Sequence, residues 1–177
     1  AGKPPGELVG PTVTVLDALL QRGAFKRECA MLGGGMSAWR LALSHDPAAL
    51  VTALARIRAY SGVAVLVIPP LQEGAYGYFA ARQALGDRLK TSHVLDIGGG
   101  SLQIAGERST FATALGQKAW HRELCQALRK TDAVPCALQP LNDNELAQAR
   151  VLLAHKLDGI ATALPGTTAM TAISRPV

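Results

Sequence analysis

Apolar residues recur at helix-like and strand-like intervals along this chain of 177 residues. Helical spacing predicts a helix over Val13–Gln21 that ends at Gly23. The apolar run 28–32 predicts a buried strand that enters a glycine loop at 33–35. Residues 1–11 are rich in glycine and proline, and they predict a mobile lead-in.

Capping residues and helix breakers define the next elements. Asp46-Pro47 is an N-cap followed by a first-turn proline, so we expect a helix from there to about Tyr60. The β-branched run Val63–Ile68 predicts a strand buried on both faces. A short helix over Ser37–Leu43, capped by Ser37, comes before these elements, and a helix over Leu71–Leu85 follows them.

The second half of the chain continues to alternate between the two patterns. The predicted elements are strands at Val94–Ile97, Leu102–Ala105 and Ser109–Leu115, a helix at Gln117–Lys130, a helix capped by Asn142 and running to His155, a strand at Ile160–Leu164 and a short helix from Thr167. Strands that alternate with helices predict an α/β chain. The polar stretch at 86–92 predicts a boundary between two domains, over 12–86 and 87–177.

Composition supports a packed domain and limits the classes of partner. Hydrophobic residues make up 49% of the chain and charged residues 18%, which allows a core. The longest uncharged apolar run, Ala59–Leu71, is too short and too rich in proline to cross a bilayer. The net charge of +5 favours anionic partners such as phosphates, nucleic acid or a membrane surface, or it serves solubility alone. The 5% of aromatic residues and the absence of a run of five basic residues argue against a stacking platform for single-stranded nucleic acid, so we expect no specific nucleic-acid partner. The chain begins without Met or an apolar signal region, which predicts a fragment of a longer protein.

The three cysteines, Cys29, Cys125 and Cys136, are odd in number and have no CxxC spacing. This pattern argues against a zinc site and against a disulfide framework. We therefore expect reduced thiols and a cytoplasmic protein.

The segment Asp96-Ile97-Gly98-Gly99-Gly100-Ser101 is the most distinctive motif. Three successive glycines allow positive φ and close approach of a ligand to the backbone, and successive amides can cradle a phosphate. An aspartate at the end of a strand can hold Mg²⁺. The motif therefore predicts a phosphate-binding hairpin, against the alternative of a plain glycine turn.

Three weaker motifs carry further candidate residues. Glu73 lies in the first turn of a helix that follows a strand, where a carboxylate can act as a general base or simply face the helix dipole. Arg40 follows the Gly33–Gly35 loop and can hold an anion or lie on the surface. Gly166-Thr167 precedes a predicted helix and can bind phosphate or form an ordinary capped turn.

The order of these motifs resembles the exopolyphosphatase and guanosine pentaphosphate phosphohydrolase (Ppx/GppA) family of the actin-like, sugar-kinase and Hsp70 superfamily. The resemblance covers roughly residues 13–174, and the segment from Asp96 to Ser101, similar to the family's DIGGGSTE, is its most specific part. Gln72-Glu73-Gly74 is similar to the family's acidic helix start. The segment GGMSAWRLA, with Arg40, is similar to its arginine loop, and Gly166-Thr167 to its GGT.

The resemblance implies an actin-like (ribonuclease H-like) α/β fold of mixed sheets and flanking helices, with 12–86 in a first lobe and 87–177 in a second. It implies hydrolysis of the terminal phosphoanhydride of polyphosphate or guanosine pentaphosphate, with Glu73 activating water and Asp96 holding Mg²⁺. The implied phosphate-binding residues are Gly98, Gly99, Gly100, Ser101, Arg40, Gly166 and Thr167. A homodimer is compatible with this interpretation.

The sequence also departs from the family pattern. Gln72 and Gln103 stand where the family has acids, Leu41 replaces the aspartate after Arg40, and Gly35 replaces a threonine. The family's first phosphate hairpin is missing, so we expect the chain to begin after it. These departures keep open a catalytically degenerate actin-like module that only binds nucleotide or polyphosphate. A sugar-kinase interpretation would need an adenosine pocket that the sequence does not show.

Overall fold

A computed structural model describes residues 4–23, 30–164, 166 and 168–173, and confirms an α/β fold with mixed sheets and flanking helices. The chain divides into two compact units, Ala1–Pro69 and Pro70–Val177. The sequence analysis placed a boundary after residue 86, whereas the helix at 70–85 belongs by its contacts to the second unit. Each unit is described by itself.

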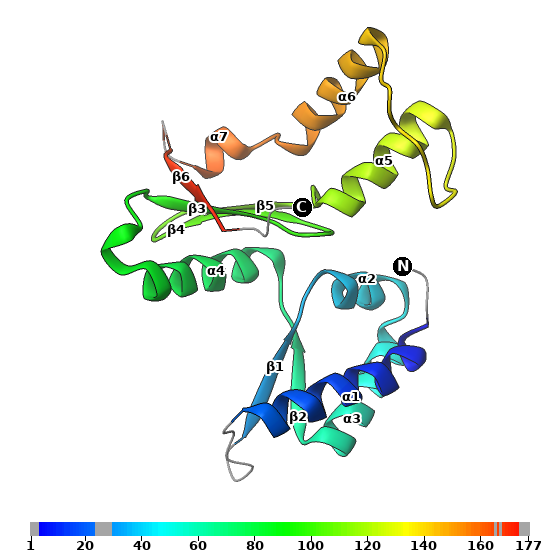
Figure 1. Ribbon diagram of the computed structural model, residues 1–177, viewed down its shortest axis with the longest axis vertical. Coiled ribbons are helices and arrows are strands. Elements are labelled where there is room, and N and C mark those ends of the chain that lie inside the picture. The colour runs from blue at the N-terminus through cyan, green and yellow to red at the C-terminus, as the bar shows by residue number, and fades with distance from the viewer. Residues whose placement is uncertain (1–3, 24–29, 165, 167, 174–177) are drawn as a thin grey trace. The chain divides into compact units, whose positions relative to one another are not determined.

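Unit 1 is a parallel pair of strands covered by helices (Figure 1). Its elements are α1 (Pro5–Arg22), β1 (Met31–Gly35), α2 (Ser37–His45), α3 (Pro47–Ser61) and β2 (Val63–Val67). Val9 of α1 packs with Ala53 and Ile57 of α3, and Trp39 and Val65 close the cluster. The apolar stripes of α1 and α3 therefore form the core of this unit.

Three predictions for unit 1 were wrong. α1 begins at Pro5 instead of after a mobile lead-in, because proline is well tolerated in the first turn of a helix. The glycines at 33–35 are not a loop but part of β1, where they pair with residues 65–67. β2 is not buried on both faces, since Leu66 is 51% exposed and the described residues give this strand a single neighbour, β1.

Unit 2 is built on a four-stranded sheet of order β5-β4-β3-β6. Its strands are β3 (His93–Ile97), β4 (Leu102–Gly106), β5 (Thr110–Thr113) and β6 (Met170–Ala172). β3, β4 and β5 are antiparallel neighbours, and β6 pairs parallel to β3. Its helices are α4 (Pro70–Leu85), η1 (Gly86–Arg88), α5 (Gln117–Arg129), α6 (Asp143–Lys156) and α7 (Ile160–Ala163).

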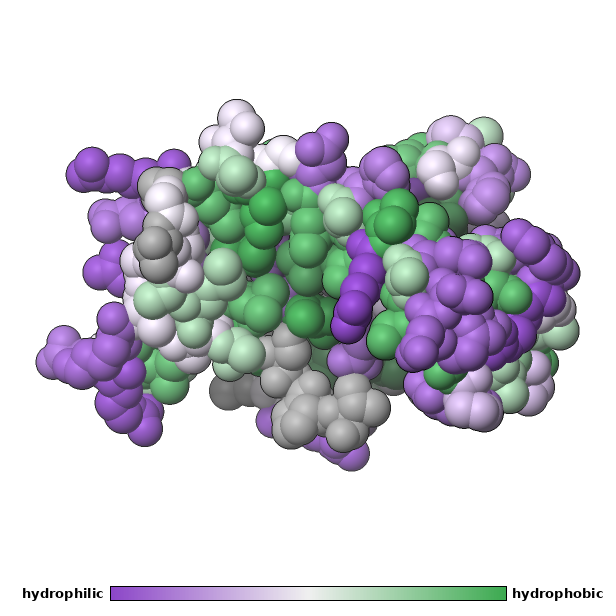
Figure 2. All heavy atoms as spheres, turned by 90° about the horizontal axis from the view of Figure 1, so that it is seen from above, coloured by the Kyte–Doolittle hydropathy of each residue, from purple (hydrophilic) through white to green (hydrophobic). Residues whose placement is uncertain are grey.

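The two faces of this sheet pack against different helices (Figure 1). Alternate residues of a strand point to opposite faces. Leu102 and Ile104 join a cluster with Trp120 of α5, Leu153 of α6 and Ile160 of α7. Ala105 and its partner Val94 pack instead against Tyr78 and Ala81 of α4. Figure 2 looks down on the α5–α7 side and shows hydrophobic surface gathered over this part of unit 2.

The predicted elements after residue 160 were wrong. Residues Ile160–Ala163 form the short helix α7 instead of a strand, and the strand β6 lies where a short helix was expected. The segment IATAL is too short to separate the two patterns by periodicity. The pairing of β6 with β3 is a contact between residues more than 70 positions apart, which local sequence does not reveal.

A buried histidine packs at the end of the β3–β4 hairpin that lies opposite its glycine loop. His93 is 5% exposed, and its ring nitrogens lie 2.9 Å from Ser92 Oγ and 2.7 Å from Ser109 Oγ. A Cβ on Gly106, its partner in the ladder, would lie 2.6 Å from His93 Nε2. Glycine at 106 thus makes room for the imidazole.

Arg129 fastens the loop between α5 and α6. Its guanidinium donates to Leu138 O over 2.8 Å and to the Glu145 carboxylate. Glu145 also completes the capping box of α6 with Asn142, which confirms the predicted cap. The Arg129 hydrogen bond, followed by that from the Asn142 amide, lowers the pKa of the Glu145 carboxyl. The stability from this contact is present above the unfolded-state pKa and is lost as the pH falls through the folded-state value.

The helix caps of unit 1 give a matched test. Asp46 Oδ1 accepts a hydrogen bond from the Ala49 amide over 2.9 Å, whereas Ser37, expected to cap α2, makes no cap bond because Met36 holds the N-cap position. We expect Asp46→Ala to lower the free energy of unfolding by about 1 kcal/mol and Ser37→Ala to change it far less. Urea denaturation followed by circular dichroism measures both. Equal losses in the two variants would contradict the assigned caps.

Candidate functional site

The glycine loop of unit 2, residues 98–101, closes the β3–β4 hairpin as predicted. The Gly98 amide donates to Ser101 O over 3.0 Å, so that amide is used inside the hairpin. The amides of Gly99 and Gly100 remain the candidates for contact with a phosphate. Gly98 and Gly99 do not have positive φ, so here the absence of a side chain serves close approach and not a left-handed turn.

Helix α5 fixes this loop through its first amides. Gln117 N donates to Gly98 O over 2.9 Å, and Lys118 N and Ala119 N donate to Gly99 O over 2.9 and 3.1 Å. The first amides of a helix have no partner inside the helix, so they need one elsewhere. The carbonyls of Gly98 and Gly99 accept these hydrogen bonds, which fix the loop to the start of α5.

Gly116 lets the two elements come this close. A Cβ on Gly116 would lie 2.3 Å from Gly100 N and 2.4 Å from Ser101 N, which is far inside van der Waals contact with backbone. Backbone atoms cannot move aside as a flexible side chain can. The glycine at 116 is therefore a steric requirement of the site.

Three polar side chains meet beside the loop, on the α4 face of the sheet. Gln103 Nε2 donates to Glu73 Oε2 over 3.1 Å and to Ser101 Oγ over 2.7 Å. Gln103 is 2% exposed and Ser101 6%, while Glu73 is partly exposed. Asp96 lies directly opposite Gln103 in the antiparallel ladder, so both side chains project from the same face. The structure thus brings together Glu73, Ser101 and Asp96 around a glutamine that bridges the first two.

Close contact between α4 and the sheet places Glu73. A Cβ on the next residue, Gly74, would lie 3.1 Å from Gln103 Cβ and 3.3 Å from Thr110 Cγ2. The first turn of α4 therefore lies directly on the Gln103 and Thr110 side chains of β4 and β5, because Gly74 adds no side chain of its own. This contact brings the Glu73 carboxylate within reach of Gln103.

The remaining predicted residues lie elsewhere. Arg40 belongs to unit 1, where its Nη1 donates to Ile68 O over 2.8 Å. Gly166 is exposed with a φ of 41° and precedes the strand β6, so the helix whose amides it was expected to supply is absent there. Thr167 lies outside the described residues. The structure therefore places the loop, Ser101, Glu73 and Asp96 in one region, and does not place Arg40 relative to them.

Sequence reasoning missed three residues of this region. Gln103 was noted only as a replacement for an acid, and Gly116 and Lys118 were not among the candidate residues. The Lys118 side chain lies beside the loop, with its Cδ 3.6 Å from where a Cβ on Gly99 would stand. The sequence signal for Gly116 and Lys118 was the start of a helix directly after a glycine, which is a common anion-binding arrangement.

The donor set of this region suits a metal only as a partner of phosphate. Among the described ranges, no three His, Cys, Asp or Glu side chains gather closely enough to form a metal cage. Mg²⁺ commonly takes one or two carboxylates together with phosphate oxygens and water. Asp96 fits the role of such a single carboxylate.

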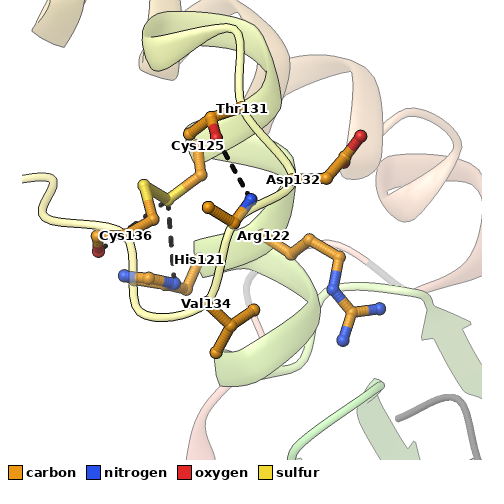
Figure 3. Close-up of a pocket in the computed structure, with 8 residues that line it drawn as sticks. His121, Arg122, Cys125, Thr131, Asp132, Val134 and Cys136 are labelled. Atoms are coloured by element: carbon orange, nitrogen blue, oxygen red, sulfur yellow. Dashed lines mark hydrogen bonds between the residues drawn. A yellow bond between two sulfur atoms is a disulfide. The ribbon is translucent and has the colours of Figure 1, made fainter.

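The cysteine prediction was wrong for two of the three residues. Cys125 of α5 and Cys136 of the following loop form a disulfide across 11 positions (Figure 3). His121, Arg122, Asp132 and Val134 line a small pocket beside it, and His121 Nδ1 lies 3.9 Å from Cys125 Sγ. The odd number of cysteines was a poor argument against a disulfide, because two of the three can pair without the third; Cys29 lies outside the described residues.

Adding a methyl group at Gly116 tests the contact between the loop and α5. We expect Gly116→Ala to lower the free energy of unfolding by about 1–3 kcal/mol, because an added carbon forces the loop off α5. Gly10→Ala is the control, because Gly10 is an exposed position of α1 with nothing within 4 Å of the added carbon. Thermal unfolding of both variants measures the difference. A Gly116→Ala variant as stable as wild type would contradict the close contact.

Opening the disulfide tests its contribution. A cross-link over a loop of this length stabilises by about 2–3 kcal/mol, mainly by restricting the unfolded chain. We expect a Cys125→Ser/Cys136→Ser variant to unfold at lower temperature than the oxidised wild type and to be insensitive to dithiothreitol. An oxidised wild type whose unfolding temperature does not change with dithiothreitol would contradict a formed disulfide.

Comparisons with known proteins agree with the fold of this site. No protein-family model matches the sequence, and no curated protein matches it. Among the solved structures that match is an exopolyphosphatase-like protein, with a TM-score of 0.66 and 19% identity over 95% of this chain and 49% of that one. The Aquifex aeolicus PPX-GPPA enzyme matches with a TM-score of 0.64 and 20% identity over 93% of this chain and 50% of its own. An exopolyphosphatase from Cytophaga hutchinsonii matches with a TM-score of 0.61 and 16% identity over 94% of this chain and 48% of its own. The chain spans about half the length of these structures. None of the described helices meets the length and hydropathy of a membrane span. The chain therefore has the Ppx/GppA-like, actin-like fold, over about half the length of its structural neighbours.

Proposed function

We propose that this chain is part of a Ppx/GppA-type phosphatase that removes terminal phosphates from polyphosphate or guanosine pentaphosphate. The observation that carries the proposal is the glycine loop fixed on α5, with the Glu73 carboxylate held beside it by Gln103. The fold shared with an exopolyphosphatase and a PPX-GPPA enzyme supports it. The identities of 16–20% carry the fold alone, so the reaction and the substrate are part of the proposal.

The loop is proposed to bind the terminal phosphate. The amides of Gly99 and Gly100 and the Ser101 hydroxyl donate to its oxygens, and the bare backbone of the glycines lets it come close. The Lys118 side chain runs past Gly99, and its amine is proposed to add a positive charge at the loop. Arg40 is proposed to neutralise phosphates farther along the substrate, and Gly166 and Thr167 are proposed to bind phosphate through their backbone amides.

Glu73 is proposed to activate the attacking water. A general base must lie within hydrogen-bond reach of the water and must be held in direction. The hydrogen bond from Gln103 fixes one carboxylate oxygen, Oε2, and with it the plane of the carboxylate. Phosphoryl transfer relies mainly on positioning and on charge stabilisation, and this arrangement supplies both.

Mg²⁺ is proposed to bind with the substrate. Asp96 would hold it, and the ion would supply charge neutralisation for the phosphate oxygens. The protein's own contribution is to keep this carboxylate at the end of β3, next to the loop. The proposed setting remains the cytoplasm, although reduced thiols no longer support it, because Cys125 and Cys136 form a disulfide.

Replacing Glu73 separates catalysis from binding. Glu73→Gln keeps an oxygen that can accept from Gln103, so the network persists while the base is lost. We expect phosphate release from polyphosphate and from guanosine pentaphosphate, in the presence of Mg²⁺, to fall by 10²-fold or more, with the affinity for the substrate within a few-fold of wild type. A phosphate-release assay and calorimetry measure the two quantities.

Gly99→Ala is the complementary variant. Its added carbon makes only an ordinary 3.6 Å contact with Lys118, so stability is expected to be kept while the affinity for phosphate falls. Unchanged phosphate release in Glu73→Gln would remove Glu73 from the mechanism. Binding without release by the wild-type chain would favour the alternative, a degenerate actin-like binding module.

A further inference from the structure

The buried amide of Gln103 is bonded to one carboxylate of the site and shares a face of the sheet with the other. Gln103 donates to Glu73 and lies opposite Asp96 in the ladder. At 2% exposure it is among the largest fully buried side chains of the described chain. A buried polar group of this size costs free energy unless its hydrogen bonds are made, and here both amide hydrogens have acceptors.

We propose that Gln103 is a positioning residue that keeps the phosphate site low in negative charge, so that the site does not collect a divalent cation of its own before a phosphate binds at the loop. The inference rests on the proposed function for the identity of the ligand. Its second part, that a neutral side chain at 103 prevents the site from collecting cations, stands on the geometry alone.

The direction of the hydrogen bonds supports this role. Ser101 Oγ accepts from Gln103, so the Ser101 proton is turned away from Gln103 toward another acceptor. A carboxylate at 103 would require Ser101 to donate inward instead. Gln103 therefore makes the Ser101 hydroxyl a donor toward a group other than residue 103, and an anion at the loop needs such a donor.

The charge count points the same way. With Gln103, the region has two carboxylates, one bonded to this amide (Glu73) and one opposite it in the ladder (Asp96). Gln103→Glu would add a third carboxylate, within hydrogen-bond distance of Glu73 and directly opposite Asp96 in the ladder. Three such oxygen ligands form a divalent-cation site, and without a cation they repel a phosphate.

The test uses inorganic pyrophosphate and Mn²⁺ as probes on the full chain. We expect Gln103→Glu to bind pyrophosphate on the order of tenfold more weakly than wild type in metal-free buffer, since an added like charge nearby costs at least that factor. Mn²⁺ is expected to restore that affinity to within threefold of wild type. Gln103→Met, which removes both donors without adding charge, is expected to lose affinity that Mn²⁺ does not restore.

An exchange variant, Glu73→Gln/Gln103→Glu, controls for folding and for charge. It keeps one amide paired with one carboxylate and the wild-type net charge. Mn²⁺ affinity, measured by electron paramagnetic resonance, is expected to rise at least tenfold in Gln103→Glu and to stay near wild type in the exchange variant. Ile104→Val, in the same strand but on the opposite face, controls for general loss of packing.

Two results would overturn the inference. One is an Mn²⁺ affinity that is the same in wild type and Gln103→Glu, or that rises equally in the exchange variant. The other is a loss of pyrophosphate affinity that is equal in Gln103→Glu and Gln103→Met and unaffected by Mn²⁺, which would make Gln103 only structural. A wild-type chain that binds no pyrophosphate would count against the proposed function, and the Mn²⁺ comparison would still decide the role of Gln103.

Discussion

The first amides of α5 and the carbonyls of the glycine loop depend on each other. A helix that starts next to a sheet has N–H groups without partners, and a hairpin loop of glycines has little side-chain packing to hold it. Three hydrogen bonds from residues 117–119 to Gly98 and Gly99 meet both needs. Gly116 makes this contact possible, because a side chain there would collide with the backbone of Gly100 and Ser101.

The strand β4 serves the core and the site at the same time. Leu102 and Ile104 project into the cluster under α5, α6 and α7, while Gln103 and Ala105 project toward α4. Along the α4 face the character changes from apolar, at Val94 and Ala105, to polar at Gln103. The apolar residues pack against α4, and at the polar end Gln103 donates a hydrogen bond to Glu73 of the same helix. One helix–sheet contact therefore contributes both core packing and the position of the candidate base.

Local signals explain what the sequence could predict. The caps at Asp46 and Asn142 and the strand-loop-strand pattern around residues 98–100 depend on neighbours a few positions away, and they were predicted correctly. The strand over 33–35 was missed because glycine favours loops, and only pairing with β2 makes it a strand. Glu73 and Gln103 were each noticed, but their hydrogen bond spans 30 positions and rests on α4 packing over β4. The disulfide between 125 and 136 likewise depends on how the loop folds back, which the cysteine count did not reveal.

The β3–β4 hairpin is held at both of its ends. At one end His93 fills the space that Gly106 leaves, with serine hydroxyls at both ring nitrogens. At the other end α5 clamps the loop. Within the four-stranded sheet, these two strands span about 17 Å, given some 3.3–3.4 Å per residue over five residues. Because both ends are fixed, we expect a displacement of the loop to be transmitted along β3 and β4 toward the β4–β5 turn.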